Sequence, residues 1–489
     1  MKLKILYIND IHSRFEELAK IASAIEELRN ENTLILDAGD NADFARLETE
    51  GTNGTISSAL LNSIGFTARV FGNNEGFAGK ENSRIISESS DCPVITCNMY
   101  DLESQKLDFL DDAVVLHISG VKILIIGVTG ATATANAFYH LFGIHVKDPQ
   151  EEIQRVLAGY EKISYDLLVI LSHLGLIGDK ELASKFPNID VIIGGHSHTI
   201  LEKPLVENQA IICQAGYFGE YLGELIVDFD TEKKKIRNFN GRLISSQKYP
   251  QHPKIMELIR HYSTQASKNL SKKLYSLDTF LDHSLTKENA IGNLLADSLK
   301  DILKTEIGII NSGVISKGVK RGGVTRKLLH QLCPSPLNPT YIELKGVDLY
   351  NTLEKSLQRE YQLNDGQGPG FRGKYLGNIQ VSHNVQVRFS PHEKSSQKMK
   401  SITVDGKPLE LDRWYTIGTS DYLQRGTGYP DLGNNRNEKY RPEFLRDILE
   451  LYLKNQSFVK MAFNRRFIIE EDEKKSFAHA DQHCTNGRV

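Results

Sequence analysis

Five short apolar runs in the first half of the chain, each ending in glycine or polar residues, constrain the fold more than any other feature. They are LKILYI (3–8), TLILDAG (33–39), VKILIIGVTG (121–130), DLLVILSHLG (166–175) and DVIIGGHSH (190–198). Runs of this length and character are typical of buried strands. Helical apolar spacing lies between several of them, over residues 15–29 and 55–64. The alternation predicts an α/β fold in which helices cover both faces of a sheet.

Polar side chains that can bind metal ions follow these predicted strands where each strand ends. In such folds the loops that begin at the carboxyl ends of strands carry the chemistry. Five separate segments contribute a residue of this kind, and together they supply Asp10, His12, Asp40, Asn73, His173, His196 and His198. One such residue alone is more often a capped strand end or a hydrogen-bonded core histidine. Seven in this order and position predict a metal site.

The mixture of carboxylate and imidazole groups indicates which ions such a site would hold. Two divalent ions about 3.5–4 Å apart need a ligand that bridges them. Asp40 is the natural candidate for that bridge. Imidazole with carboxylate suits Mn, Fe, Co, Ni or Zn better than Mg²⁺ or Ca²⁺. The absence of thiolates from the set argues against a structural zinc site.

The motifs D-I-H, G-D, G-N-N-E, S-H and G-H-S-H together resemble those of the calcineurin-like metallophosphoesterases. INSGV near 310 and RGTGY near 428 extend the resemblance to the 5′-nucleotidase family, which includes UDP-sugar hydrolases. The resemblance covers roughly residues 3–470, and a bacterial cytoplasmic branch of the family looks closest to this chain. The resemblance implies a four-layer αββα catalytic domain and a smaller C-terminal α/β domain. We expect the catalytic domain at 1–235, a linker and inter-domain helix at 236–280, the second domain at 281–470 and a flexible tail at 471–489.

The resemblance also implies a ligand set and a reaction. One ion would be held by Asp10, His12, Asp40 and His198, and the other by Asp40, Asn73, His173 and His196. A metal-activated hydroxide would then attack the phosphorus of a nucleotide-type ester or anhydride. Alternative functions are a nucleotide-binding sensor with weak turnover and a cyclic-nucleotide phosphodiesterase.

Asn74 departs from the family pattern, which has a histidine there and an acidic residue at the position of Phe77. That histidine would stabilise the transition state or protonate the leaving group, and the loss of a general acid commonly costs about 10²–10⁴ in rate. Three interpretations are open: a substrate with a good leaving group, another residue in the role, or a protein that binds without turnover. Asn74 itself can donate a hydrogen bond to phosphate, so with Asp40 it is a candidate catalytic residue. Glu75 and His140 are further candidates for the acid.

In the family the second domain binds the nucleotide between aromatic rings and near arginines. Tyr429 matches one of the stacking positions, whereas Asn378 stands where the other aromatic residue is expected. Phe371 or Tyr375 could substitute for it. Ser316 replaces an arginine, and Lys317, Lys320 and Arg321 follow it. The candidate substrate-binding residues are Tyr429, Asn311, Asn338, Arg372, Tyr375 and Arg425.

Composition limits the remaining function classes. The formal net charge of −3 argues against a nucleic-acid polymer as partner. No apolar stretch approaches the length of a membrane span, and the N-terminus lacks the long apolar region of a secretory signal. The five cysteines show no disulfide or zinc spacing. We therefore expect a cytoplasmic monomer or dimer with reduced thiols.

Overall fold

The computed structural model describes residues 1–368, 370–393 and 397–470. The chain forms two compact units that divide between Leu270 and Ser271. The expected tail, 471–489, lies outside the described residues. Within the described ranges, no helix is both long enough and apolar enough to cross a bilayer.

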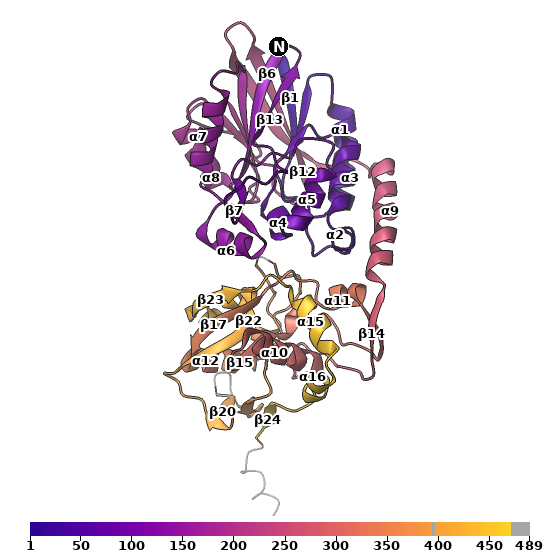
Figure 1. Ribbon diagram of the computed structural model, residues 1–489, viewed down its shortest axis with the longest axis vertical. Helices are drawn as coiled ribbons and strands as arrows, with labels where there is room; N and C mark the ends of the chain where they lie inside the picture. Colours follow the sequence, from indigo (N-terminus) through magenta and orange to yellow (C-terminus); the bar gives the residue numbers. More distant parts are fainter. Residues whose placement is uncertain (369, 394–396, 471–489) are drawn as a thin grey trace, which may run out of the picture. The chain divides into compact units, whose positions relative to one another are not determined.

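The first unit contains two packed sheets with helices on their outer faces (Figure 1). One sheet has the strand order β13-β12-β1-β2-β3 and the other the order β10-β11-β9-β8-β6-β5. A small pair, β4 and β7, lies beside them in the same unit. The strands are β1 Lys2–Ile8, β2 Thr33–Asp37, β3 Ala68–Arg69, β4 Met99–Asp101, β5 Ala113–Ile118, β6 Val121–Thr129, β7 Ile144–Val146, β8 Leu167–His173, β9 Val191–Gly194, β10 Leu205–Glu207, β11 Ala210–Cys213, β12 Tyr221–Asp230 and β13 Lys235–Ser245. The helices are α1 Phe15–Leu28, α2 Leu47–Gly51, α3 Thr55–Ile64, α4 Asn73–Phe77, α5 Lys80–Glu88, α6 Ala133–Leu141, α7 Pro149–Tyr160, α8 Leu176–Lys185 and α9 Pro253–Leu270.

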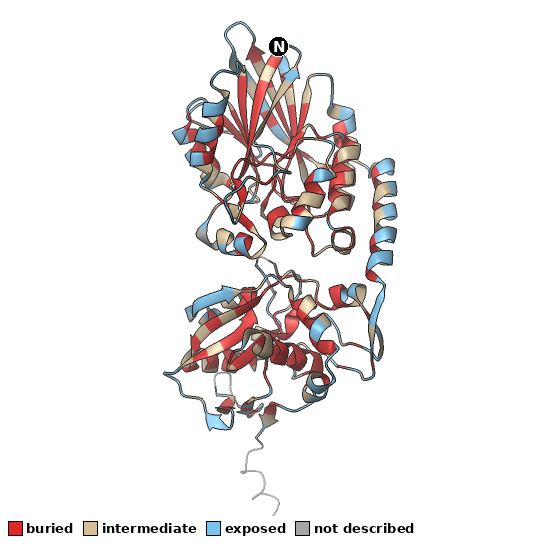
Figure 2. Ribbon diagram, viewed as in Figure 1, coloured by how far each residue is buried: buried red, intermediate tan, exposed pale blue. Residues whose placement is uncertain are grey.

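Strand β1 shows how sequence alternation builds the layers. Leu3, Ile5 and Tyr7 point into the core between the two sheets, where they join residues of β6, β8 and β9. Leu6 and Ile8 point the other way, into a core with α1, α3 and α9. This is the period of two that a strand buried on both faces requires. Figure 2 shows the strands of both sheets as largely buried. The four-layer αββα prediction is confirmed.

The end of this unit differs from the expected boundary. Strand β13 pairs with β12 along its length, so residues 236–245 are an edge strand of the first sheet, not part of a linker. Its basic and polar residues, such as Lys235, Arg237 and Arg242, suit an edge that faces solvent on one side. Helix α9 contacts α1, α2 and α3 and therefore also belongs to the first unit.

The second unit is a separate α/β structure around a five-stranded sheet with the order β18-β15-β22-β17-β23. A four-stranded sheet, β21-β20-β19-β24, and a pair, β14 and β16, complete it. The strands are β14 Lys273–Leu277, β15 Ile307–Asn311, β16 Gly322–Thr325, β17 Pro339–Lys345, β18 Ile379–Val381, β19 Val385–Phe389, β20 Met399–Val404, β21 Lys407–Pro408, β22 Trp414–Ser420, β23 Arg436–Tyr440 and β24 Phe467–Ile469. The helices are α10 Ala290–Leu303, α11 Arg326–Leu332, α12 Gly346–Ser356, α13 Arg359–Gln362, α14 Asp421–Gln424, α15 Leu445–Leu453 and α16 Gln456–Met461. Helix α10 packs on β15 and β22 and is almost entirely buried.

Candidate metal centre

Most of the predicted ligands lie on loops that leave the two sheets of the first unit and run beside one another, while His173 ends β8 and Asn73 begins α4. Residues 10–13, after β1, continue the pairing with residues 39–41, after β2. The backbone N–H of Asp10 donates to Gly39 O at 2.9 Å, and that of His12 donates to Asp40 O at 2.9 Å. These bonds fix Asp10, His12 and Asp40 against one another although they come from separate strands.

Five of the seven predicted ligands have left-handed backbone conformations. The φ angles are 53° at Asp10, 47° at His12, 57° at Asp40, 74° at His196 and 55° at His198. Residues other than glycine seldom adopt this region, and it costs on the order of 1 kcal/mol or more for each of them. The strain is concentrated where side chains from several strand ends converge.

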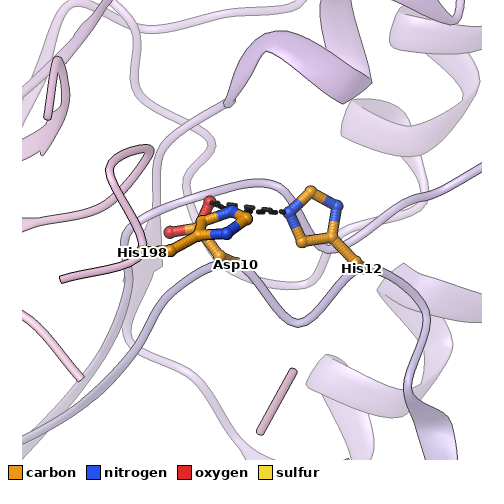
Figure 3. Close-up of side chains that lie close together, drawn as sticks. All are labelled: Asp10, His12 and His198. Carbon is orange, nitrogen blue, oxygen red and sulfur yellow. Dashed lines mark hydrogen bonds and ion pairs between the residues drawn. The ribbon is translucent and has the colours of Figure 1, made fainter. Parts of the chain in front are cut away.

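Asp10, His12 and His198 form the first group of converging side chains (Figure 3). His198 Nε2 lies 3.3 Å from Asp10 Oδ1, and His12 Nε2 lies 3.7 Å from the same oxygen. The two Nε2 atoms are 3.2 Å apart. Three ligand-type atoms therefore face a common point, as a metal site requires.

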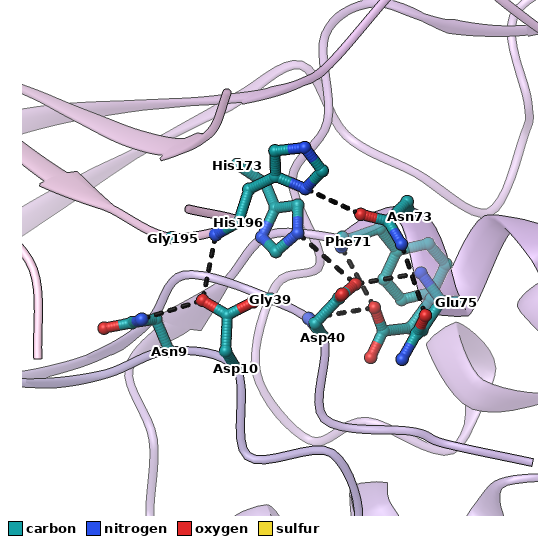
Figure 4. Close-up of polar contacts among 12 residues, drawn as sticks. Asn9, Asp10, Gly39, Asp40, Phe71, Asn73, Glu75, His173, Gly195 and His196 are labelled. Atoms are coloured by element: carbon teal, nitrogen blue, oxygen red, sulfur yellow. Dashed lines mark hydrogen bonds and ion pairs between the residues drawn. The ribbon is translucent and has the colours of Figure 1, made fainter. Parts of the chain in front are cut away.

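Asp40 and His173 form a second group with Asp10, and Asn73 and His196 lie beside it (Figure 4). His173 Nε2 is 3.4 Å from Asp40 Oδ1, while Asp40 Oδ2 lies 3.8 Å from His12 Nε2 of the first group. Asn73 Oδ1 is 2.8 Å from His196 Nδ1. The two oxygens of Asp40 thus face different groups, as expected of a bridging carboxylate. All seven predicted ligands come together.

Two buried atoms in the centre have no hydrogen-bond partner among the residues that the structure describes. They are Asp10 Oδ1 and His173 Nε2, and both point towards other ligand-type atoms. A buried polar atom without a partner is costly. The other atoms of these side chains are held in place, since His173 Nδ1 lies 2.7 Å from Ala38 O and Asp10 Oδ2 accepts the N–H of His196 at 2.9 Å. The residues present therefore fit divalent metal ions.

The charges in the centre support each other without a metal. Burial opposes ionisation of Asp10, yet contacts with His12 and His198 lower the pKa of its carboxyl. Burial would lower the pKa of His173, but Asp40 beside it raises that pKa to about 10. The raised pKa favours a proton on His173, so metal binding there has to displace it.

A buried carboxylate, Glu75, holds the Asp40 loop in place. Its Oε1 accepts the backbone N–H groups of Asn41 and Ala42, at 2.7 and 2.9 Å. Its Oε2 accepts those of Asp40 and Gly72, at 3.1 and 3.0 Å. At Gly72, a Cβ would lie 2.0 Å from Asp40 Oδ1, so the close approach of the two loops requires glycine there.

A second buried network supports the loop that carries His196 and His198. Asp179 accepts hydrogen bonds from Ser172 Oγ at 2.5 Å and from Gln214 Nε2 at 2.8 Å. Ser197 Oγ in turn donates to Gln214 Oε1 at 2.9 Å. Ser172 precedes His173, and Ser197 lies between His196 and His198, so the network connects segments that carry three ligands.

Neither network could be recognised from the sequence, nor could the aromatic residues beside the histidines. The Tyr217 ring stacks on His198 with centroids 4.9 Å apart, and Phe218 meets His12 edge-on at 5.7 Å. Residues 214–218 follow β11 without any motif, and only the strand order places them at the site. The one available signal was the polar Gln214 directly after an apolar run.

The residues considered as general acids are engaged elsewhere. Asn74 lies with its side-chain nitrogen 2.8 Å from His12 Nδ1, and its backbone N–H donates to Asp40 Oδ1 at 2.8 Å. Glu75 is buried, and its carboxylate accepts hydrogen bonds from four backbone amides. His140 is exposed and contacts His145 at 2.8 Å. Phe77 packs on Tyr139, with ring centroids 4.7 Å apart.

The expected substrate residues of the second unit lie at the ends of its central strands, but several are not available to a ligand. Tyr429 is fully buried and its hydroxyl donates to Gly377 O at 2.7 Å, so the expected stacking of a base on its ring is wrong for this arrangement. Asn338 is buried and donates to the carbonyls of residues 441–443. Asn378, where an aromatic residue was expected, accepts from Ser312 Oγ.

The other candidate substrate-binding residues of this unit are more exposed or have a polar atom without a hydrogen-bond partner in the described residues. Asn311 Nδ2 donates to Leu376 O, but its buried Oδ1 has no partner. Arg425 pairs with Asp421 at 2.8 Å, and Arg372 is an exposed side chain that donates to Phe371 O. Tyr375 is half-buried beneath the ammonium group of Lys374. Ser316, Lys317, Lys320 and Arg321 are exposed.

Comparisons with known proteins match both units. Residues 3–199 match the calcineurin-like phosphoesterase family, and residues 269–433 match the 5′-nucleotidase C-terminal domain. An uncharacterized metallophosphoesterase of Bacillus subtilis, YunD, is 30% identical over 92% of this chain and 98% of its own length. A 5′-nucleotidase of Vibrio cholerae is 24% identical, over 88% of this chain and 86% of its own. The structure of the Haemophilus influenzae NAD nucleotidase is similar with a TM-score of 0.66 at 17% identity, over 96% of this chain and 100% of its own.

Proposed function

Because the chain belongs to the calcineurin-like metallophosphoesterases with a 5′-nucleotidase C-terminal domain, we propose that it hydrolyses phosphate ester or anhydride bonds of nucleotide-type substrates with two divalent ions. The observation that supports this most directly is the pair of orphaned buried atoms, Asp10 Oδ1 and His173 Nε2, aimed into a cluster of ligands. A bound cation would stabilise both atoms, which have no hydrogen-bond partner in the described residues.

The seven ligands would form two sets, one for each ion. Asp10, His12 and His198 would hold one, and Asn73, His173 and His196 the other, with Asp40 facing both groups. When bound, such ions supply an acidified water and positive charge opposite the phosphoryl oxygens. The imidazole-rich set favours Mn, Fe, Co, Ni or Zn. The buried loops supported by Glu75 and Asp179 would keep the ligands in place through turnover.

The leaving group follows from the residues around the centre. A departing alkoxide needs a proton, whereas a departing phosphate or nucleoside phosphate is already a stable anion. Asn74, Glu75 and His140 all have other partners and none is placed as a proton donor. We therefore propose that the enzyme prefers anhydrides, such as nucleotide-linked pyrophosphates, over phosphate monoesters and cyclic esters.

A substrate panel with added Mn²⁺ tests both proposals. It would contain UDP-glucose, NAD, AMP, UMP and 2′,3′-cyclic AMP, with Asp40→Asn as the control. The readouts are UMP and glucose 1-phosphate from UDP-glucose, AMP and nicotinamide mononucleotide from NAD, phosphate and nucleoside from AMP and UMP, and adenosine monophosphate from the cyclic ester. We expect turnover of the two anhydrides to exceed that of the esters by about 10² or more. Faster turnover of AMP or UMP would contradict the preference, and turnover that survives in Asp40→Asn would contradict the metal centre.

A further inference from the structure

Residue 74 touches three predicted metal ligands at once, because its Oδ1 also accepts a hydrogen bond from Asn73 Nδ2 at 3.2 Å. Its backbone N–H donates to Asp40 Oδ1 at 2.8 Å, and its side-chain amide lies 2.8 Å from Nδ1 of His12. The carboxylate of Asp43 is the other polar group near that nitrogen, at 4.0 Å, which is beyond hydrogen-bond distance. The Asn74 amide is therefore the nearer partner of His12 Nδ1.

The other nitrogen of His12 faces the metal centre. His12 Nε2 lies 3.7 Å from Asp10 Oδ1 and 3.2 Å from His198 Nε2. A neutral imidazole carries one proton, on either nitrogen. If Nε2 offers its lone pair to a metal ion, the proton resides on Nδ1, and Nδ1 becomes a donor.

We propose that Asn74 is a positioning residue for His12 and not a general acid, an inference that rests on the proposed two-metal function. In the metal-loaded protein, its Oδ1 accepts the Nδ1–H of His12. This requires the amide to be turned by 180° from the orientation with Nδ2 towards His12. The oxygen and nitrogen of an amide have nearly the same shape, so the turned amide fits the same space. The turn exchanges the 3.2 Å hydrogen bond that Asn73 Nδ2 donates to Asn74 Oδ1 for the bond from His12. Residue 74 then fixes the tautomer and the ring orientation of one ligand and the carboxylate of another.

Mn²⁺ affinity, measured by calorimetry on the whole chain, tests this without reference to turnover. Asn74→Ala keeps the backbone N–H but removes the acceptor, so we expect Mn²⁺ binding about 10- to 100-fold weaker. Asn74→Asp restores an acceptor of the same length, and we expect affinity equal to or above that of the wild type. Asn82→Ala is the matched control: Asn82 lies on the next helix, α5, and its side chain donates to Ala78 O, so the variant should bind like the wild type.

The outcomes separate this inference from the proposed function. Unchanged Mn²⁺ affinity in a folded Asn74→Ala protein would overturn the positioning role, while loss of binding in Asp40→Asn would leave the metal centre standing. Weak binding in Asn74→Asp as well as in Asn74→Ala would also overturn it. A wild type that binds no Mn²⁺ would overturn both. Thermal unfolding of each variant shows whether it is folded.

Discussion

The carboxylate of Glu75 accepts the backbone N–H of Asp40 at 3.1 Å, so a buried charge on one loop fixes the residue that faces both halves of the metal centre. The same carboxylate accepts three further amides, from Asn41, Ala42 and Gly72. Two segments that follow different strands are thereby joined beside the Asp40 carboxylate, which itself accepts the backbone N–H of Asn74.

Glu75→Gln tests whether this carboxylate holds the two segments together. The substitution keeps the shape but places an amide N–H₂ against two backbone donors, and each buried donor without an acceptor costs about 1–3 kcal/mol. We expect urea unfolding to show a loss of stability of at least about 1–3 kcal/mol, the cost of one such donor, together with weaker Mn²⁺ binding. Glu257→Gln, on the exposed face of α9, is the control and should stay within about 0.5 kcal/mol. Equal stability of the two variants would remove the structural role of Glu75.

Asp179 should give the protein a specific pH dependence. Burial raises the pKa of its carboxyl to about 7, against about 3.9 in an unfolded chain. The folded state therefore binds the proton more tightly, so this group lowers stability progressively as pH rises from about 4 to about 7. Asp179→Asn lacks the titration and can still accept from Gln214 while donating to Ser172. With EDTA present, we expect the variant to gain stability relative to the wild type across that range, by at most about 1.4 kcal/mol per pH unit, and to gain no more above pH 8. A difference that is constant with pH would contradict the assignment.

Gly194 is where this network meets the loop of His196 and His198. A Cβ there would lie 2.1 Å from Asp179 Oδ2 and 2.7 Å from Gln214 Nε2, both buried and hydrogen-bonded. We expect Gly194→Ala to cost about 1–3 kcal/mol in urea unfolding and to weaken Mn²⁺ binding. Gly159→Ala, in α7 with no atom within 4 Å of the new Cβ, should instead stabilise by up to about 1 kcal/mol. Similar effects at both positions would show that the contact with Asp179 is unimportant.

In the second unit, the buried position of Tyr429 predicts that its substitution lowers the stability of the fold and leaves nucleotide affinity unchanged. Tyr429→Phe removes the hydrogen bond to Gly377 O and leaves that carbonyl without its partner. We expect a loss of about 1 kcal/mol in unfolding, with nucleotide affinity unchanged. The larger change Tyr429→Leu should destabilise further and still not affect affinity in the folded fraction. A selective loss of nucleotide binding in Tyr429→Leu would restore the stacking role.

The sequence predicted most of the metal centre because its ligands obey two local rules. Apolar runs mark the strands, and the ligand side chains stand directly after them, as Asp10 follows Ile8 and His196 follows Gly194. Parallel strand ends meet at one edge, so position along the chain was enough to bring the ligands together. The αββα layers followed from the same runs.

What could not be predicted depends on tertiary contacts between residues without a pattern. Nothing local shows that Asn74 faces His12, because His12 comes from another loop. Of the four amides that Glu75 accepts, the one from Gly72 is local, and the other three come from the loop after β2. The strand β13 was expected in a linker because its residues are mostly polar, yet pairing with β12 decides its place. Tyr429 matched a motif position, but burial decides what a tyrosine can do.

Metal removal should reveal the strain stored in the centre. Five ligand residues hold left-handed φ angles, and Asp40 raises the pKa of His173 to about 10, which favours a proton where a cation would bind. An ion that binds only the folded state stabilises it by about 2.7 kcal/mol at 100 times its dissociation constant. We therefore expect added Mn²⁺ to raise the melting temperature, EDTA to reverse the rise, and Mg²⁺ to have a smaller effect at this imidazole-rich site. His173→Ala should abolish the shift, whereas His140→Ala, which changes only an exposed pair with His145, should keep it in full. A Mn²⁺ shift that persists in His173→Ala would place the ion elsewhere, because His173 Nε2 is one of the two buried ligand atoms that have no hydrogen-bond partner in the described ranges.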